Sequence, residues 1–306
     1  MNVANGGWGF TAAKAYSINC RGRLLDLSSP VVMGILNVTP DSFYDGGKFT
    51  EERAILEKAG DLVRGGAAII DIGGASSRPG SAYIAEEVEL KRVLPAVALV
   101  RKSYPDIIIS VDTWRSKVAR EAVASGADMV NDISAGLLDA DLLPAVAELK
   151  VPYVLMHMKG NPADMQASPS YENVTAEVLR FLQNRIAEIR DMGILDVLVD
   201  PGFGFGKSVD DNFRLLNDLD AFQLLDCPVL AGISRKSMVY KSLKINANNS
   251  LTGTISLNTI ALLKGASVLR VHDAEDAIHC IRLVEKLKAV AGSNCSTSAA
   301  PTPQSP

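Results

Sequence analysis

Four polar side chains stand at the ends of separate apolar segments and together have the chemistry to bind one small molecule. They are Asp112, Asn131, Asp200 and Lys236. Two carboxylates and an amide can exchange hydrogen bonds with a flat heterocycle that has amino and oxo edges. A nearby lysine keeps the carboxylates ionised and can donate to a ring carbonyl or nitrogen. One such aspartate alone would suggest a helix cap or a structural ion pair, whereas four groups around one opening favour a binding site.

Two basic side chains near the end of the sequence are suited to an anion. Arg270 and His272 are two residues apart in VLRVHD, so on a strand both would point to the same face. Together with Arg78 they could neutralise a diphosphate, and loops near the last two strands of α/β barrels commonly hold phosphate. The alternative is a structural salt bridge to Asp273 or Asp200.

Two polar segments, residues 38–50 and 74–84, are long for connections between a strand and a helix. Connections well above the usual length of about 2–6 residues are typical of mobile lids over active sites. Merely tolerated surface loops would not need so many reactive side chains. Those side chains are Asp41, Phe43, Asp45, Ser77 and Arg78.

The three histidines argue against a histidine-held zinc site. His157, His272 and His279 form no HxH pair, and His279 falls within the last predicted helix. Oxygen ligands such as Asn37, acting with the phosphates of a substrate, suit Mg²⁺ instead. The VDPGFGFG segment matches the GxGxxG spacing only loosely and is weak evidence for a nucleotide.

Eight short apolar segments alternate with helical stretches and must position these residues. The helical stretches have apolar residues at spacings of three and four, as between residues 85 and 102 and between 173 and 192. Strands rich in Val and Ile, with little alternation, indicate a parallel sheet that is covered on both faces. Eight such units predict a (β/α)8 TIM barrel, an α/β fold; the alternative, a doubly wound sheet, would usually have a glycine-rich turn after the first strand. The strand segments are 31–38, 67–74, 107–113, 129–134, 152–158, 197–203, 228–234 and 268–273.

The predicted barrel occupies residues 31–291, and the polar residues fall at the carboxyl ends of its strands, where barrels of this type carry their active sites. Residues 1–30 form an N-terminal extension with a hairpin around Arg21 and Gly22. Residues 292–306 are rich in Ser, Thr, Pro and Ala, and we expect them to be a disordered tail.

The composition excludes several classes of function. With 306 residues, 47% hydrophobic residues and a net charge of -4, the chain is globular and has no basic run for a nucleic acid. No apolar run reaches the roughly 18 residues of a membrane span, and the N-terminus lacks the pattern of a signal peptide. The four cysteines form no CxxC pair, which predicts reduced thiols and a cytoplasmic protein.

Eight segments of the sequence, taken together, resemble the dihydropteroate synthase family. The resemblance extends from Val31 to about Lys288 and follows the family's order. The segments are GILNVTPDSFYDGG, DIGGASSRPG, SVDTWR, VNDIS, LMHMKG, VDPGFGFGK, GISRKS and RVHD. The resemblance implies a transferase of folate biosynthesis that joins (7,8-dihydropterin-6-yl)methyl diphosphate to p-aminobenzoate, giving 7,8-dihydropteroate and diphosphate. It also implies Mg²⁺ as cofactor, small molecules as the partners, a homodimer and a target for sulfonamides.

The same resemblance implies a role for each matching residue. The residues that would bind the pterin are Asp112, Asn131, Ile133, Met156, Asp200, Phe205, Gly232 and Lys236. Those that would hold the diphosphate are Asn37, Ser77, Arg78, Arg270 and His272, with Asn37 also on the metal. Those that would form the p-aminobenzoate pocket are Phe43, Ser77, Pro79, Lys236 and Ser237. Those that would take part in catalysis are Asp45, Arg78, Lys236, Arg270 and His272, with Asp45 stabilising a pterin methylene cation.

Two positions depart from the family pattern GGESTRPG. Ala75 replaces the glutamate, and Ser77 replaces the threonine but keeps its hydroxyl. Two alternatives to a synthase are a catalytically silent pterin-binding paralogue and the pterin domain of a corrinoid-dependent methyltransferase. The methyltransferase domain would need no diphosphate grip, so Arg78, Arg270 and His272 argue against it.

Overall fold

A computed structural model of the chain describes residues 14–39, 48–75, 84–160 and 170–293. Within them, eight parallel strands form one sheet in the order β8-β7-β6-β5-β4-β3-β10-β9. A parallel bridge between Val199 and Val229 links the two ends of this sheet and makes it a barrel. The predicted TIM barrel is confirmed, and the doubly wound sheet is wrong. The strands are β3 (Val31–Asn37), β4 (Ile69–Gly73), β5 (Ile108–Asp112), β6 (Met129–Asp132), β7 (Tyr153–Met156), β8 (Val197–Asp200), β9 (Leu230–Ala231) and β10 (Val268–Val271).

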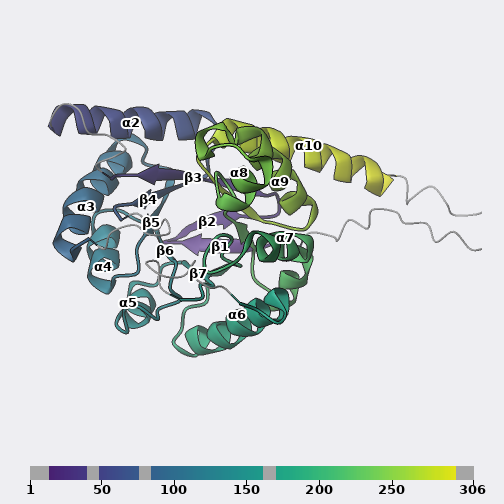
Figure 1. The fold of residues 1–306 in the computed structure, drawn as a ribbon. Helices are drawn as coiled ribbons and strands as arrows, with labels where there is room; N and C mark the ends of the chain where they lie inside the picture. The colour runs from purple at the N-terminus through teal and green to yellow at the C-terminus, as the bar shows by residue number, and fades with distance from the viewer. Residues whose placement is uncertain (1–13, 40–47, 76–83, 161–169, 294–306) are drawn as a thin grey trace, which may run out of the picture.

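Helices surround the barrel as an outer ring (Figure 1). The regular alternation has two additions: a 3-10 helix, η1 (Leu219–Leu225), precedes β9, and the connection from β9 to β10 is divided. We expected one helical stretch in that connection, but Lys244 takes a left-handed conformation with φ 56° and ends α8, and η2 (Ala247–Asn249) follows. The α-helices are α2 (Lys48–Arg64), α3 (Glu86–Ser103), α4 (Ser116–Ala124), α5 (Leu142–Leu149), α6 (Val174–Asp191), α7 (Val209–Asn217), α8 (Ser237–Leu243), α9 (Leu251–Leu263) and α10 (Ala274–Ser293).

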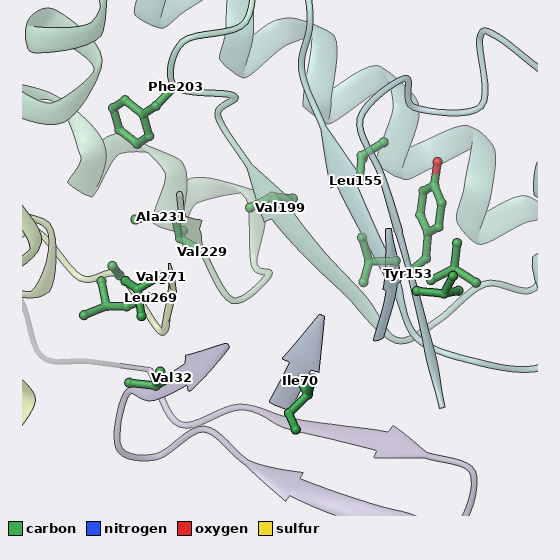
Figure 2. Close-up of a cluster of buried hydrophobic side chains, with 14 of the residues drawn as sticks. Val32, Ile70, Tyr153, Leu155, Val199, Phe203, Val229, Ala231, Leu269 and Val271 are labelled. Carbon is green, nitrogen blue, oxygen red and sulfur yellow. The ribbon is translucent and has the colours of Figure 1, made fainter. Parts of the chain in front are cut away.

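Alternate residues of each strand face opposite sides of the barrel wall. Those that face outward form one continuous apolar core with the helices, and Figure 2 shows part of it. Val32, Ile70, Leu155 and Leu269 in this core come from four different strands and are all fully buried. Because this outer core packs the strands against the helices, the inward-facing residues can be apolar at one end of the barrel and polar at the other.

The N-terminal hairpin closes one end of the barrel. Strands β1 (Ser17–Cys20) and β2 (Arg23–Asp26) are antiparallel, and Cys20 pairs with Arg23 across a two-residue turn. Arg21 and Gly22 in this turn have φ of 54° and 89°, and two positive φ angles suit the twist of a tight hairpin. In Figure 1 the hairpin lies across the middle of the ring of helices. The hairpin prediction is confirmed.

Apolar hairpin residues form one buried cluster with an inward-facing residue from each of the eight barrel strands. Ile18 and Leu25 are examples from the hairpin, and both are buried. The barrel residues are Met33, Ile69, Ile108, Met129, Val154, Leu198, Leu230 and Val268. This apolar end lies at the amino ends of the strands, so the carboxyl ends remain for the polar site.

The chain ends add little to this architecture. Residues 292 and 293 belong to α10, and the rest of the expected tail lies outside the described residues, as do residues 1–13. Among the described residues, no helix is long and apolar enough to cross a membrane.

Candidate active site

The inward-facing polar residues converge at the carboxyl ends of the strands. Asp112 and Asp200 are the last residues of β5 and β8, and both are buried. Gly232, directly after β9, lies close to Lys236 and Asp200. A Cβ at this position would be 3.6 Å from Lys236 Nζ and 3.7 Å from Asp200 Oδ2. The same Cβ would be 3.9 Å from Arg270 Cβ. The predicted groups therefore meet around the carboxyl-end mouth of the barrel, called the opening below, and a Cβ at position 232 would be in ordinary van der Waals contact with them.

Arg270 is held by two carboxylates inside the barrel. Its Nε donates to Asp71 Oδ2 at 2.7 Å, and its Nη2 donates to Asp112 Oδ2 at 2.6 Å. Burial alone would lower the pKa of Arg270, but the two aspartates raise it well above its usual range. Arg270 thus forms ion pairs, as the alternative interpretation of the sequence expected, but with Asp71 and Asp112. Asp200 only helps to raise the pKa of Arg270, and Asp273 accepts from Arg235 Nη2 at 2.7 Å.

The two aspartates of the predicted pterin set are costly to ionise. Burial raises the pKa of Asp112 to about 7, although Arg270 opposes the shift. Burial also raises the pKa of Asp200, while Lys236 and the backbone N–H of Gly202 lower it. The Gly202 N–H donates to Asp200 Oδ1 at 2.7 Å, which leaves Asp200 Oδ2 toward the opening. Near neutral pH Asp112 is therefore poised between an acceptor and a donor form.

Lys236 lies at the start of α8 and reaches back over the opening. Its Nζ donates to the carbonyl of Phe203 and stands 4.7 Å from the centre of the Phe205 ring. Burial and the neighbouring Arg270 lower the pKa of Lys236 to about 8, although Asp200 raises it. Lys236 is therefore a cation near neutral pH that loses its proton on modest alkalinisation.

Among the described residues, the His272 side chain is hydrogen-bonded to a hydroxyl, that of Ser234. Ser234 Oγ lies 2.9 Å from His272 Nδ1 and also accepts from the His272 backbone N–H at 3.3 Å. Burial and the charges of Arg235 and Arg270 lower the pKa of His272 to about 3. The expected basic pair is thus one permanent cation, Arg270, and an imidazole that is neutral at pH 7.

Apolar side chains line the other side of the opening. Ile133, Met156 and Phe205, predicted to line the pterin slot, form one buried cluster with Trp114. The sequence prediction gave Trp114 no role. A flat slot between these side chains and the carboxylates suits an aromatic ring.

A buried lysine fixes the loop that carries Phe205. Lys207 Nζ donates to the carbonyls of Gly202 at 2.9 Å and Phe205 at 3.1 Å, and lies 2.9 Å from His157 Nδ1. Burial lowers the pKa of Lys207 to about 7 and that of His157 to about 2. Gly202 is required for this approach, because it has φ 73° and a Cβ would stand 1.9 Å from the His157 carbonyl oxygen.

The remaining predicted residues lie at the rim or outside the described part. Asn37 ends β3, and a Cβ on Gly73 would stand 3.6 Å from both Asn37 Oδ1 and Asp112 Oδ2. Ser237 begins α8, next to Lys236. The predicted residues that lie outside the described residues are Phe43, Asp45, Ser77, Arg78 and Pro79, together with Asp41.

Comparison with known proteins assigns this arrangement to a family. A family model for pterin binding enzymes matches residues 33–272. The dihydropteroate synthase of Escherichia coli K12 is 43% identical over 267 residues, which are 87% of this chain and 94% of that protein. The chain belongs to the dihydropteroate synthase family.

Solved structures of the family agree with this membership. A Yersinia pestis dihydropteroate synthase in complex with a sulfonamide drug has a TM-score of 0.84 and 40% identity, covering 90% of this chain and 100% of that one. The Xanthomonas albilineans dihydropteroate synthase in complex with 7,8-dihydropteroate has a TM-score of 0.81 and 39% identity, covering 90% and 99%.

One departure from the dihydropteroate synthase pattern has a local explanation. Ala75 replaces the family's glutamate and packs, partly buried, against the cluster of Trp114, Ile133, Met156 and Phe205. An alanine can join this apolar contact, whereas a carboxylate there would need a partner. The other departure, Ser77, lies outside the described residues.

Proposed function

We propose that this member of the dihydropteroate synthase family condenses (7,8-dihydropterin-6-yl)methyl diphosphate with p-aminobenzoate. The observation that carries the proposal is the convergence of Asp112, Asp200, Lys236 and Arg270 on one opening beside an apolar wall. The diphosphate C–O bond breaks, a C–N bond forms to the aniline nitrogen, and that nitrogen loses one proton. The chain is thus a transferase of folate biosynthesis.

The pterin would lie in the slot with its polar edge toward the carboxylates. Asp112, Asn131 and Asp200 supply oxygens for the amino and N–H groups of the ring, and Lys236 supplies a donor for a ring oxygen or nitrogen. On the apolar side Ile133, Met156 and Phe205 would cover the faces of the ring, and Gly232 leaves the space that the ring needs. A buried hydrogen bond to a charged group contributes about 1.5–3 kcal/mol, so this edge would dominate affinity.

The diphosphate would leave toward the positive side of the opening. Arg270 and Arg78 would neutralise its charge, while Ser77 and the neutral imidazole of His272 would donate hydrogen bonds. Charge that develops on the leaving group is thereby stabilised, which lowers the barrier to departure. A covalent enzyme intermediate is not needed, since the leaving group is already activated.

The p-aminobenzoate pocket would form beside Lys236 and Ser237. Phe43, Ser77 and Pro79 would complete this pocket from the two long loops. Asp45 would stabilise the pterin methylene cation until the weakly basic amine attacks. Sulfonamides mimic p-aminobenzoate, so excess p-aminobenzoate should relieve their inhibition of this enzyme.

Magnesium suits the residues at the rim. Among the described residues, no group of three or more His, Cys, Asp or Glu side chains could hold a metal by itself. Mg²⁺ usually needs only one or two protein oxygens, with water and substrate phosphates filling the remaining positions. Asn37 Oδ1, which shares the space above Gly73 with Asp112, is such an oxygen. When bound, the ion would neutralise diphosphate charge.

A homodimer would cover an exposed apolar face on α10. Leu283, Leu287 and Val290 are 72%, 51% and 50% exposed, and their spacing of four and three puts them on one side of the helix. Ile260 of the adjacent α9 is 39% exposed. An apolar face of this kind marks an interface in many proteins.

The cytoplasm is the compartment we propose, because Cys20, Cys227 and Cys280 are free thiols.

The direct test is synthesis of the product. The chain is incubated with the pterin methyl diphosphate and labelled p-aminobenzoate, with and without Mg²⁺, and labelled dihydropteroate is measured. We expect product only with the metal. No product under either condition, with pterin binding intact, would instead indicate a catalytically silent pterin-binding protein.

A further inference from the structure

Asp71 is a buried carboxylate whose hydrogen bonds go to two residues of the pterin site. It stands in the middle of β4, is fully buried and faces the interior of the barrel. Its Oδ2 accepts from Arg270 Nε at 2.7 Å and from Asn131 Nδ2 at 3.0 Å. The two donors come from strands that lie 199 and 60 residues away in the sequence. Asp71 therefore links Arg270 on β10 to Asn131 on β6 from a position inside the barrel.

The contact with Asn131 decides which end of its amide meets the ligand. An ionised carboxylate can only accept hydrogen bonds, so the amide nitrogen of Asn131 must face Asp71. The carbonyl oxygen then points the other way and is presented as an acceptor. Asn131 is also paired in register with Asp112, whose carboxylate is a second acceptor. Reversing the amide would set its oxygen against the carboxylate of Asp71, which is unfavourable.

The contact with Arg270 fixes the plane of its guanidinium. Nε is bound by Asp71 and Nη2 by Asp112, so two bonds from different strands hold one rigid group. The Asp71 contact keeps Arg270 from depending on Asp112 alone. Arg270 uses only Oδ2 of Asp112, so within the described part of the chain the other oxygen stays available for a ligand.

A purely structural role does not explain how Asp71 is bonded. Among the described residues, its second oxygen, Oδ1, is buried and has no hydrogen-bond partner. A carboxylate placed for stability alone would satisfy both oxygens, because an unpaired buried acceptor is destabilising. All hydrogen bonds of the Asp71 side chain in this part of the chain thus serve Asn131 and Arg270.

We propose that Asp71 is a positioning residue for pterin recognition, which turns the carbonyl of Asn131 toward the ligand and holds Arg270 in its plane. Asp71 touches no substrate in this assignment and acts through those two side chains. The proposal rests on the proposed function, since the ligand presented to Asn131 is taken to be a pterin with N–H donors on its edge.

An exchange of the two side chains tests this assignment. Asn131→Asp alone sets two carboxylates face to face and should weaken the binding of pterin-6-carboxylate by about tenfold or more. Asp71→Asn combined with Asn131→Asp restores the contact in reverse. Both contacts of Asp71 use Oδ2, so the amide nitrogen at position 71 then donates to the carboxylate at position 131 and leaves Arg270 with Asp112 only, while the outward atom at position 131 remains an acceptor. The double variant should bind at least about fivefold more tightly than Asn131→Asp.

Ser110→Ala is the matched control. Ser110 pairs with Asp71 in register on β5, is equally buried, and its hydroxyl has no hydrogen-bond partner among the described residues. This variant should bind the pterin within about twofold of the wild type. Affinity is measured by isothermal titration calorimetry, with the melting temperature of each variant recorded alongside.

Two outcomes would overturn the proposal. One is a folded double variant that binds no better than Asn131→Asp. The other is an Asn131→Asp variant that binds as tightly as the wild type. Failure of the proposed function would be distinct, because the wild-type protein itself would then bind no pterin-6-carboxylate.

Discussion

The two ends of the barrel are built from the same strands but have opposite interiors. On β4, Ile69 faces the hairpin, and Asp71, two residues later, binds Arg270. On β5, Ile108 lies in the apolar cluster, and Asp112 lies at the opening. A step of about 7 Å along β4, or about 13 Å along β5, therefore changes the interior from apolar to charged.

The difference separates what stabilises the fold from what binds the ligand. Burial of apolar surface at the hairpin end contributes about 25 cal/mol per Å². At the other end, burial shifts the pKa values of Asp112, Asp200 and Lys236. Each shift means that burial of the charged side chain costs free energy in the folded protein. Buried ion pairs add little net stability, so we propose that these charges serve a ligand and not the fold.

The largest change in free energy should be a loss of folding stability from a substitution at the apolar end. Ile108→Ala leaves a cavity beneath the hairpin and should lower the free energy of unfolding by about 2–5 kcal/mol. Pterin affinity should stay within about twofold, because Ile108 lies four residues before Asp112 on the same strand, about 13 Å away. Denaturant unfolding and calorimetric titration measure the two quantities. A loss of pterin affinity in the folded variant would mean that the two ends are coupled.

The opposite result is expected at the polar end. Asp200→Ala removes a charged partner of the pterin edge and should weaken pterin binding by about 1.5–3 kcal/mol, or roughly tenfold to more than hundredfold. Its unfolding free energy should change less than that of Ile108→Ala. The same titration decides, and unchanged pterin affinity would show that the opening is not the pterin site.

Acid should destabilise the polar end through His157. Its pKa is lowered to about 2, far below the 6.5 of an unfolded histidine. The stabilisation is therefore present above pH 6.5 and is lost as the pH falls toward 2, by up to about 1.4 kcal/mol per pH unit. His157→Gln should reduce the loss of unfolding free energy between pH 7.5 and 5 by about 2 kcal/mol. An unchanged loss in this variant would argue against a buried neutral imidazole.

Pterin affinity should depend on pH in a bell shape. Below about 7 the Asp112 carboxylate takes up a proton and stops accepting, and above about 8 Lys236 loses its proton. Each limb should change affinity by at most about tenfold per pH unit. Lys236→Arg should flatten the alkaline limb, whatever its absolute affinity, because arginine stays charged. Calorimetry from pH 5.5 to 9.5 would detect a flat profile, which would exclude these two groups from the contact.

The smallest effect on pterin affinity is expected from the long loops. Asp45→Ala and Phe43→Ala should lower turnover while pterin affinity stays within about twofold, because these residues are assigned to the second substrate and the cation. Initial rates of dihydropteroate formation and pterin titrations of the same preparations separate the two effects. Equal losses in both would move these residues into the pterin slot.

The sequence was sufficient for features with a local signal. Eight apolar segments predicted the barrel, Arg21 and Gly22 predicted the hairpin, and polar residues at strand ends predicted the convergence of Asp112 and Asp200. Long-range partners had no such signal. Asp71 sits in an apolar run and meets Arg270 only when the barrel closes, so the sequence indicated neither this contact nor that of Asp273 with Arg235.

The protonation states of buried side chains could not be predicted from the sequence either. His272 was taken as half of a basic pair, yet burial beside Arg235 and Arg270 keeps it neutral. The buried bond from Lys207 to the Phe205 carbonyl was missed for the same reason. Desolvation depends on what covers a group, and that is set by the folded chain alone.

The most direct measurement is a crystal structure of the chain with a bound pterin. We predict density for the ring between Phe205 and the carboxylates of Asp112 and Asp200, with Asn131 presenting its carbonyl oxygen to an N–H of the ring. Density for the pterin at any other place on the barrel, with this opening empty, would contradict it.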